Sequence, residues 1–217
     1  MEITVTENTL QTSRHTTGYL AAGPTDGPLL IFVHGWPELS LSWRHQISTF
    51  AGLGFRVVAP DMRGYGRSAT YGSVTDFGQE VIVGDMIELL DHLGNDSAVC
   101  IGHDWGRPVV WTSASHHPDR CHAVASLRVP YRTLEHGWDE MIAHVDRNVY
   151  PVGLYPVGQW DYQLFYQENF EKAVRVFEAD PYMTVKALFR KGDPRGLGKP
   201  ALTASVRADG GWFGGAD

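Results

Sequence analysis

The sequence predicts an α/β fold in which a mostly parallel sheet carries helices on both faces. Short apolar runs recur along the first 130 residues, as expected for strands that are buried on both sides. Segments with helical periodicity separate these runs, and this alternation is typical of a parallel sheet. The chain has 217 residues, 43% of them apolar, which is enough to bury one substantial core.

The predicted strands form two groups. Alternating polar and apolar residues predict two antiparallel strands at 2–7 and 11–20, joined by the turn-forming pair Glu7-Asn8. Farther along the chain, continuous apolar runs predict strands that are fully buried. These buried strands are predicted at 28–35, 55–61, 97–104 and 121–129.

Helices are predicted between the buried strands. The clearest helical pattern covers 76–93, with Thr75 as its N-cap and Gly94 just past its end. Another helix is expected from about residue 106, and Pro108 then falls in its first turn, where proline is tolerated.

The rhythm of strands and helices stops after Pro130. Residues 131–217 look helical and irregular, and they hold more than half of the aromatic residues. We therefore divide the chain into a core at 1–130 and a helical lid at 131–217. The aromatic residues favour a lid over an apolar pocket, and a small helical subdomain with its own aromatic core is the alternative.

Composition and charge exclude several classes of function. The net charge is −7, from 18 basic and 25 acidic residues, and no lysine or arginine run stands out, so we expect no nucleic-acid partner. The N-terminus lacks a basic and then apolar signal peptide. No apolar run reaches the roughly 18 residues of a membrane span. These patterns predict a cytoplasmic protein that does not bind membranes.

The two cysteines, Cys100 and Cys121, both fall in apolar stretches. That placement favours two buried free thiols over a disulfide, in keeping with a reducing compartment.

The stretch Gly102-His103-Asp104-Trp105-Gly106 carries the strongest chemical signal. It follows a predicted strand and precedes a predicted helix, which is the setting of a nucleophile turn. The turn lies at the carboxyl edge of the sheet, where open α/β sheets bind ligands. Asp104 is the candidate nucleophile, and a tight turn in which Asp104 only caps the helix is the alternative.

A carboxylate at this turn suits attack on a saturated carbon. The helix N-terminus favours the ionised form of Asp104. Attack would give an alkyl-enzyme ester, which water must then hydrolyse with the help of a general base and an oxyanion hole.

The segment His34-Gly35-Trp36-Pro37 supplies a candidate oxyanion hole at the end of a buried strand. The backbone N–H groups of Trp36 and Trp105 are its expected donors. Gly35 permits an unusual backbone, and Pro37 is a candidate cis-proline. For His34 we prefer a hydrogen-bonded structural role over a catalytic one. The side chains of His34, Pro37 and Trp105 are expected to line the substrate pocket.

Three segments, HGWPELSLSWRHQ (34–46), DMRGYGRS (61–68) and GHDWG (102–106), together resemble those of epoxide hydrolases of the α/β-hydrolase fold. The resemblance covers roughly residues 15–217. It implies that Asp104 attacks an epoxide carbon and that no cofactor or metal is needed. It also implies that Tyr162, within DYQLFYQ (161–167), donates a proton to the ring oxygen; the alternative is a buried core tyrosine.

Haloalkane dehalogenases resemble the same pattern, since Trp105 could contact a halide. Two features favour an epoxide over a haloalkane as the substrate: the HGWP segment and the segment around Tyr162. The aromatic lid suggests a small epoxide with an apolar or aryl substituent. No spacing of histidines, cysteines or carboxylates resembles a metal site.

The sequence departs from the epoxide hydrolase pattern in two places. Arg107 replaces a small residue, so its side chain either crowds the approach of strand and helix or points outward. The last strands and helices of the fold, with the acid and the histidine base, are also absent from the sequence. We therefore expect a C-terminally truncated chain in which the ester persists, or a non-catalytic fragment. Its incomplete sheet edge is expected to favour self-association.

Overall fold

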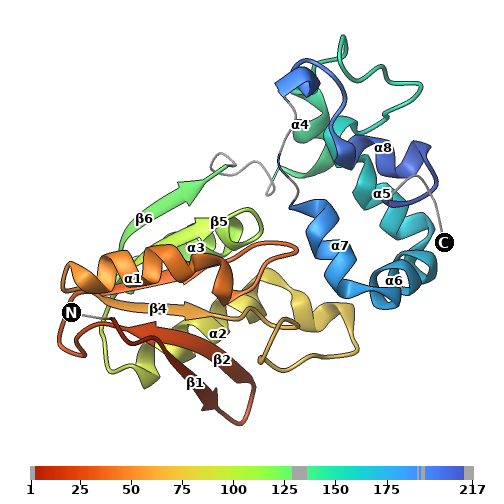
Figure 1. Cartoon of the computed structure of the whole chain (residues 1–217). Coiled ribbons are helices and arrows are strands. Elements are labelled where there is room, and N and C mark those ends of the chain that lie inside the picture. Colours follow the sequence, from red (N-terminus) through yellow and green to blue (C-terminus); the bar gives the residue numbers. More distant parts are fainter. Residues whose placement is uncertain (1–2, 129–135, 190, 192–193, 213–217) are drawn as a thin grey trace. The chain divides into compact units, whose positions relative to one another are not determined.

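A computed structural model describes residues 3–128, 136–189, 191 and 194–212 (Figure 1). The chain divides into two compact units, Met1–Arg132 and Thr133–Asp217. Within the described residues, no helix has the length and apolar character needed to cross a membrane.

A six-stranded sheet forms the centre of the first unit. The strands lie in the order β1-β2-β4-β3-β5-β6. The four strands from β4 to β6 are parallel, and β1 and β2 add an antiparallel pair at one edge. The predicted mostly parallel α/β fold is therefore confirmed. The strands are β1 (Thr6–Gln11), β2 (Thr16–Ala22), β3 (Leu29–Val33), β4 (Arg56–Pro60), β5 (Ala98–His103) and β6 (Cys121–Leu127).

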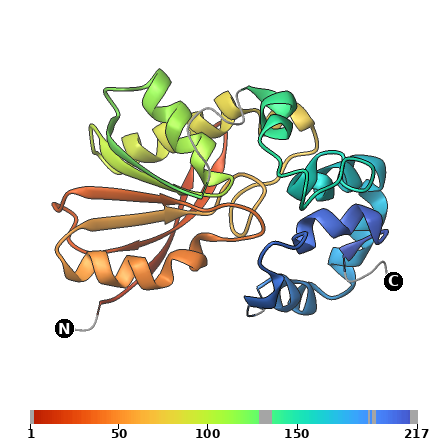
Figure 2. The ribbon, with the colours of Figure 1, turned by 90° about the horizontal axis from the view of Figure 1, so that it is seen from above.

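Helices cover both faces of this sheet (Figure 2). On one face, α1 packs Ile47 and Ala51 against the even-numbered side chains of β3. On the other face, α2 and α3 pack against the odd-numbered side chains of the same strand. Because alternate side chains of a strand point to opposite faces, a strand buried on both sides must be apolar throughout, as β3 is. The helices are α1 (Arg44–Gly52), α2 (Gln79–His92) and α3 (Gly106–His116), with 3₁₀ turns η1 (Ser40–Trp43) and η2 (Val74–Phe77).

The turn between β1 and β2 lies at residues 12–15, so its prediction at Glu7-Asn8 is wrong. Glu7 and Asn8 pair with β2 inside the ladder. The hydroxyl of Thr12 accepts hydrogen bonds from the backbone N–H groups of Arg14 and His15. These side-chain bonds make the turn without the glycine or asparagine that usually signals one.

The start of α2 also differs from its prediction at residue 76 with Thr75 as N-cap. Residues 74–77 form the 3₁₀ turn η2, and Ser73 and Asp76 form a capping box around its first turn. Gly78 then has an extended backbone, and α2 begins at Gln79. The segment predicted as one helix therefore forms two elements, the 3₁₀ turn η2 and the helix α2. The capping box stabilises η2 independently of α2.

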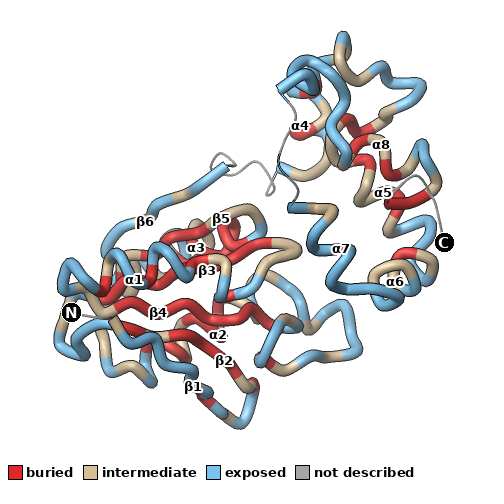
Figure 3. Tube along the Cα trace, viewed as in Figure 1, coloured by how far each residue is buried: buried red, intermediate tan, exposed pale blue. Residues whose placement is uncertain are grey.

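Within its described residues, the second unit consists of helices joined by turns and irregular segments (Figure 3). An aromatic cluster lies at its centre, where the ring of Tyr166 contacts those of Tyr162 and Phe177. The fully buried Trp212 donates a hydrogen bond to the hydroxyl of Tyr166. Part of the aromatic enrichment therefore forms a core inside this unit. The elements are α4 (Gly137–Ala143), η3 (Gly158–Trp160), α5 (Asp161–Glu168), α6 (Phe170–Ala179), α7 (Pro181–Leu188), η4 (Pro194–Gly196) and α8 (Leu202–Ala208).

Candidate active site

A sharp turn between β5 and α3 presents Asp104 at the carboxyl edge of the sheet. Asp104 has a φ of 52°, in the left-handed region that non-glycine residues rarely adopt. Two glycines allow the strand and helix to approach each other closely. A Cβ on Gly102 would lie 2.6 Å from the carbonyl oxygen of Gly106, and one on Gly106 would lie 2.7 Å from that of His34.

Arg107 follows this turn and is fully buried, with 0% of its surface exposed. Of the two orientations expected for its side chain, the outward one is therefore wrong. The helix accommodates the long side chain inside the first unit, and the backbone N–H of Arg107 still donates to the carbonyl of Asp104.

The backbone N–H of Trp36 donates a hydrogen bond to Oδ1 of Asp104 at 3.1 Å. The Trp36–Pro37 peptide bond is cis. Gly35 makes this approach possible, because any Cβ at that position would collide with Cβ of Asp104 and lie 2.8 Å from the backbone nitrogen of Trp105. The loop after β3 and the turn after β5 thus bring the Trp36 N–H to the candidate nucleophile.

His34 is buried and holds two loops in place. Its Nε2 accepts a hydrogen bond from the backbone N–H of Met62, so the proton lies on Nδ1, which donates to the carbonyl of Gly35 at 2.8 Å. Burial lowers the pKa of His34, and the imidazole is neutral. With both nitrogens bonded to backbone groups, this residue orients the loop and has no nitrogen available for a catalytic base.

Glu38 and His103 form an ion pair beside the turn, with Oε2 and Nδ1 2.9 Å apart. The hydrogen bond from His103 lowers the pKa of Glu38, and the bond to Glu38 raises the pKa of His103. The pair joins the loop after β3 to the end of β5. No local sequence pattern indicates this pair, because the two residues are 65 positions apart.

A cavity of about 210 Å³ lies next to the candidate nucleophile turn. His34 and Trp105, two of the three residues predicted to line a substrate pocket, line this cavity. Pro37, the third, is not among its lining residues and forms the cis peptide bond described above. Trp105 is 42% exposed at this opening. The sequence pattern did not indicate the remaining walls, which come from the loop after β4 and the start of α2. The full lining is His34, Gly35, Met62, Arg63, Tyr65, Phe77, Gln79, Ile82, Trp105 and Val109.

Tyr162, the candidate proton donor, lies in the second unit near the start of α5. Its hydroxyl accepts a hydrogen bond from Nε2 of Gln163 at 3.2 Å. Its ring packs against Tyr166 and Trp212, with ring centroids 5.6 and 6.2 Å away. Tyr162 is half-buried in this aromatic cluster. Throughout the described part of the chain, no three histidine, cysteine or carboxylate side chains gather as metal ligands would.

The fold and the turn define a class of protein. A strand, a sharp turn with a candidate nucleophile at positive φ and a helix follow one another at the edge of a parallel sheet. A family model described as alpha/beta hydrolase fold matches residues 28–188. The chain therefore belongs to the α/β-hydrolase fold family.

Within this family, the chain is similar to epoxide hydrolases. It is 49% identical over 114 residues to epoxide hydrolase B of Mycobacterium tuberculosis, covering 52% of this chain and 32% of that protein. It is 38% identical over 188 residues to the bifunctional epoxide hydrolase 2 of Sus scrofa, covering 86% of this chain and 31% of that protein. The crystal structure of epoxide hydrolase A from Mycobacterium thermoresistibile matches with a TM-score of 0.73 at 33% identity. The match covers 91% of this chain and 61% of that chain. The chain thus spans about a third of the length of these curated relatives.

Proposed function

We propose that this chain carries the ester-forming half of an epoxide hydrolase, whose full reaction converts an epoxide and water to a vicinal diol. One observation supports this proposal above all. The carboxylate of Asp104 lies at the turn after β5, with one oxygen bound by the backbone N–H of Trp36. That bond leaves the second carboxylate oxygen to attack a carbon next to the ring oxygen.

The first step requires a proton donor for the oxygen that leaves its carbon. We propose Tyr162 for this role, since a phenol can protonate or hydrogen-bond an alkoxide near neutral pH. Its place in the segment DYQLFYQ supports the assignment. The mostly apolar lining of the cavity beside Trp105 supports a small epoxide with an apolar substituent.

The second step is attack of water on the carbonyl carbon of the ester. We propose that the N–H groups of Trp36 and Trp105 stabilise the oxyanion that then forms. A base must also activate the water. His34 is bonded through both nitrogens, and His103 is paired with Glu38. Neither of these two histidines is available as that base, and we therefore propose that the ester accumulates.

The intact mass of the purified chain after treatment with styrene oxide tests this proposal. We expect one covalent adduct per chain that maps to Asp104, is absent in Asp104→Asn, and forms about 10²-fold or more slowly in Tyr162→Phe. Tyr155→Phe is the matched control and should keep the wild-type rate. If a folded chain gives neither adduct nor diol, the proposal is wrong. Halide release from a haloalkane without reaction of the epoxide would favour a haloalkane dehalogenase instead.

We further propose a cytoplasmic location and no nucleic-acid partner. The two free cysteines and the net charge of −7 support these assignments. Fractionation of cells that express the tagged chain checks the location.

A further inference from the structure

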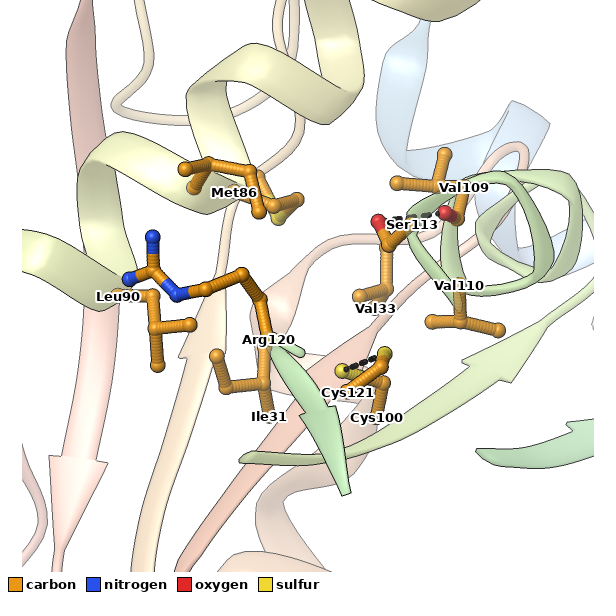
Figure 4. Close-up of a pocket in the computed structure, with 11 residues that line it drawn as sticks. Ile31, Val33, Met86, Leu90, Cys100, Val109, Val110, Ser113, Arg120 and Cys121 are labelled. Carbon is orange, nitrogen blue, oxygen red and sulfur yellow. Dashed lines mark hydrogen bonds between the residues drawn. The ribbon is translucent and has the colours of Figure 1, made fainter. Parts of the chain in front are cut away.

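The only two cysteines of the chain meet in the first unit. Cys100 lies in β5 and Cys121 begins the neighbouring strand β6. Their sulfur atoms are 3.1 Å apart although the residues are 21 positions apart in the sequence. Figure 4 shows the two side chains turned toward each other. This contact is close enough that two thiols need only small side-chain rotations to reach the S–S bond length of about 2.05 Å.

The ladder between the two strands explains how these residues meet. Cys121 is the partner of Ala98, and Cys100 is the partner of Val124. The register shifts between Ala98 and Val99, so one extra residue of β6 lies between the paired positions. This irregularity sets the two sulfurs diagonally across neighbouring strands and on the same face of the sheet.

We propose that Cys100 and Cys121 are a reversible redox pair that closes to an intramolecular disulfide when a peroxide oxidises the chain. In the first step, the thiolate of Cys121 attacks hydrogen peroxide, forming a sulfenic acid and releasing hydroxide. In the second step, the sulfur of Cys100 attacks that sulfenic sulfur and forms the S–S bond, while the S–O bond breaks and the proton of Cys100 leaves with the hydroxyl as water. Overall, two thiols and one peroxide give one disulfide and two waters, and a dithiol reductant reverses the change.

The surroundings assign different roles to the two sulfurs. Cys121 is half-buried and Cys100 is 9% exposed. Oxidants in solution therefore reach Cys121 first. The hydrogen bond between the two thiols lowers the pKa of Cys121, while the same interaction and burial raise the pKa of Cys100. Cys121 is thus the thiol that ionises and reacts, and Cys100 is the resolving thiol that keeps its proton.

A small cavity adjoins the two sulfurs. Its volume is about 20 Å³, which is room for about one water molecule, and both cysteines line it together with apolar side chains of β3, α2 and α3 (Figure 4). Arg120 also lines this space, and its guanidinium donates hydrogen bonds to Asp91 and to the carbonyl of Asp96. The cavity gives the sulfurs space to rotate without displacing packed atoms.

The disulfide would close a loop from residue 100 to residue 121 that contains the turn at Asp104 and the whole of α3. It would also tie β6, an edge strand of the sheet, to β5. Because a cross-link restricts the unfolded chain, we expect oxidation to raise the Tm by about 5–10 °C.

The test treats the fully reduced chain with hydrogen peroxide and dimedone, a reagent that traps sulfenic acids, and follows the intact mass. We expect the mass of wild type to fall by about 2 Da, with no dimedone label attached. Peptide mapping should show a disulfide between the peptides of Cys100 and Cys121, and dithiothreitol should reverse it. In Cys100→Ala, the sulfenic acid has no resolving thiol, so dimedone should label Cys121. In Cys121→Ser, Cys100 should stay reduced. Alanine is chosen at position 100 because the side chain there is buried. If a variant does not fold, the disulfide of the wild-type chain still tests the inference.

Three outcomes would overturn the inference. The first is dimedone labelling of wild type without loss of mass, and the second is a disulfide between two chains. In the third, the internal disulfide forms as fast in urea as in buffer. We expect unfolding to slow closure about tenfold or more, because it separates the two sulfurs.

Discussion

At the scale of single residues, the candidate site depends on positions where no side chain fits. Gly35 lies against the turn after β5, where a Cβ would collide with Asp104 and approach the nitrogen of Trp105. The hydrogen bond between Trp36 and Asp104 forms only if this approach is kept. The site thus requires glycine at position 35 for reasons of space.

Gly35→Ala is expected to lower the free energy of unfolding by about 2–3 kcal/mol, because both contacting groups belong to packed backbone segments. The matched control is Gly52→Ala in α1, where a Cβ meets nothing within 4 Å. That control should be neutral or stabilising by up to about 1 kcal/mol. Urea denaturation of both variants checks this, and equal loss in the two would contradict the argument.

The ion pair between Glu38 and His103 predicts a pH-dependent contribution to stability. His103 has a raised pKa, so its contribution is present at low pH and is lost as pH rises through that value. Glu38 has a lowered pKa, so its contribution is present at higher pH and is lost as pH falls through that value. Both contributions coexist between the ordinary pKa values of about 4.3 for glutamate and 6.5 for histidine.

Glu38→Gln should therefore lower the free energy of unfolding by about 1 kcal/mol near pH 5.5, and by less near pH 9. The control is Glu140→Gln, which removes an exposed pair with His144 and should change stability by less than about 0.5 kcal/mol. Urea titrations at both pH values measure the difference. A loss from Glu38→Gln that is the same at both pH values would contradict the role of this pair.

At the scale of elements, a buried carboxylate joins α2 to two loops. Asp85 is 1% exposed and accepts two hydrogen bonds from Arg63, which follows β4, and one from Arg14 in the turn after β1. The guanidinium of Arg63 also lies over the ring of Tyr71 at 4.4 Å. These contacts fix the loop that forms one wall of the cavity beside Trp105.

Asp85→Asn is expected to destabilise the chain by about 3–5 kcal/mol, because it leaves the charge of buried Arg63 without its counter-ion. Asp91→Asn provides a control on the same helix. Asp91 pairs with Arg120 at an exposed position, and the loss there should be at most about 1 kcal/mol. Thermal unfolding of the two variants compares these effects, and a small loss at Asp85 would show that the network is not stabilising.

The sequence predicted the buried strands well and the polar connections poorly. β3 and β4 each fall within their predicted ranges. A short, continuous apolar run bounded by turn residues is typical of a strand that is buried on both faces. β6 ends at Leu127, and residue 129 of its predicted range lies outside the described residues. The prediction that this strand is fully buried is wrong, because β6 lies at an edge of the sheet and four of its seven residues are exposed. The turn at Thr12 and the capping box at Ser73 depend on side-chain hydrogen bonds, which periodicity does not report.

The residues of the candidate site also fall into a predictable group and an unpredictable one. Asp104 and Trp36 could be named because short motifs mark them, and they are adjacent in the structure. The cavity walls at Phe77 and Gln79 and the ion pair at Glu38 could not, because each brings together segments far apart in the sequence. Such contacts depend on the tertiary fold and leave no local pattern.

At the scale of the whole molecule, the sheet has β6 at one of its two edges within the described residues. Four of the seven residues of β6 are exposed, whereas every residue of β3 is buried. An exposed edge strand presents backbone donors and acceptors that can pair with another chain. We propose that a second copy of this chain is the partner that pairs there.

The isolated 217-residue chain is therefore expected to associate as its concentration rises. Ala125→Lys places a charge on the exposed side of β6 and should shift the distribution toward monomer. The control is Glu178→Lys at an exposed position of α6, and it should leave the distribution of monomer and larger species unchanged. Sedimentation velocity over a concentration series measures this. A wild-type chain that is monomeric throughout would contradict the proposal.

The backbone angle of Asp104 has a consequence for separating folding from chemistry. A φ of 52° suits asparagine better than most residues, and asparagine retains the oxygen that accepts from Trp36. Asp104→Asn is therefore expected to keep its Tm within about 2 °C of wild type, or above it, while losing the proposed nucleophile. Selection for thermal stability alone would then give no warning that the reaction had been lost.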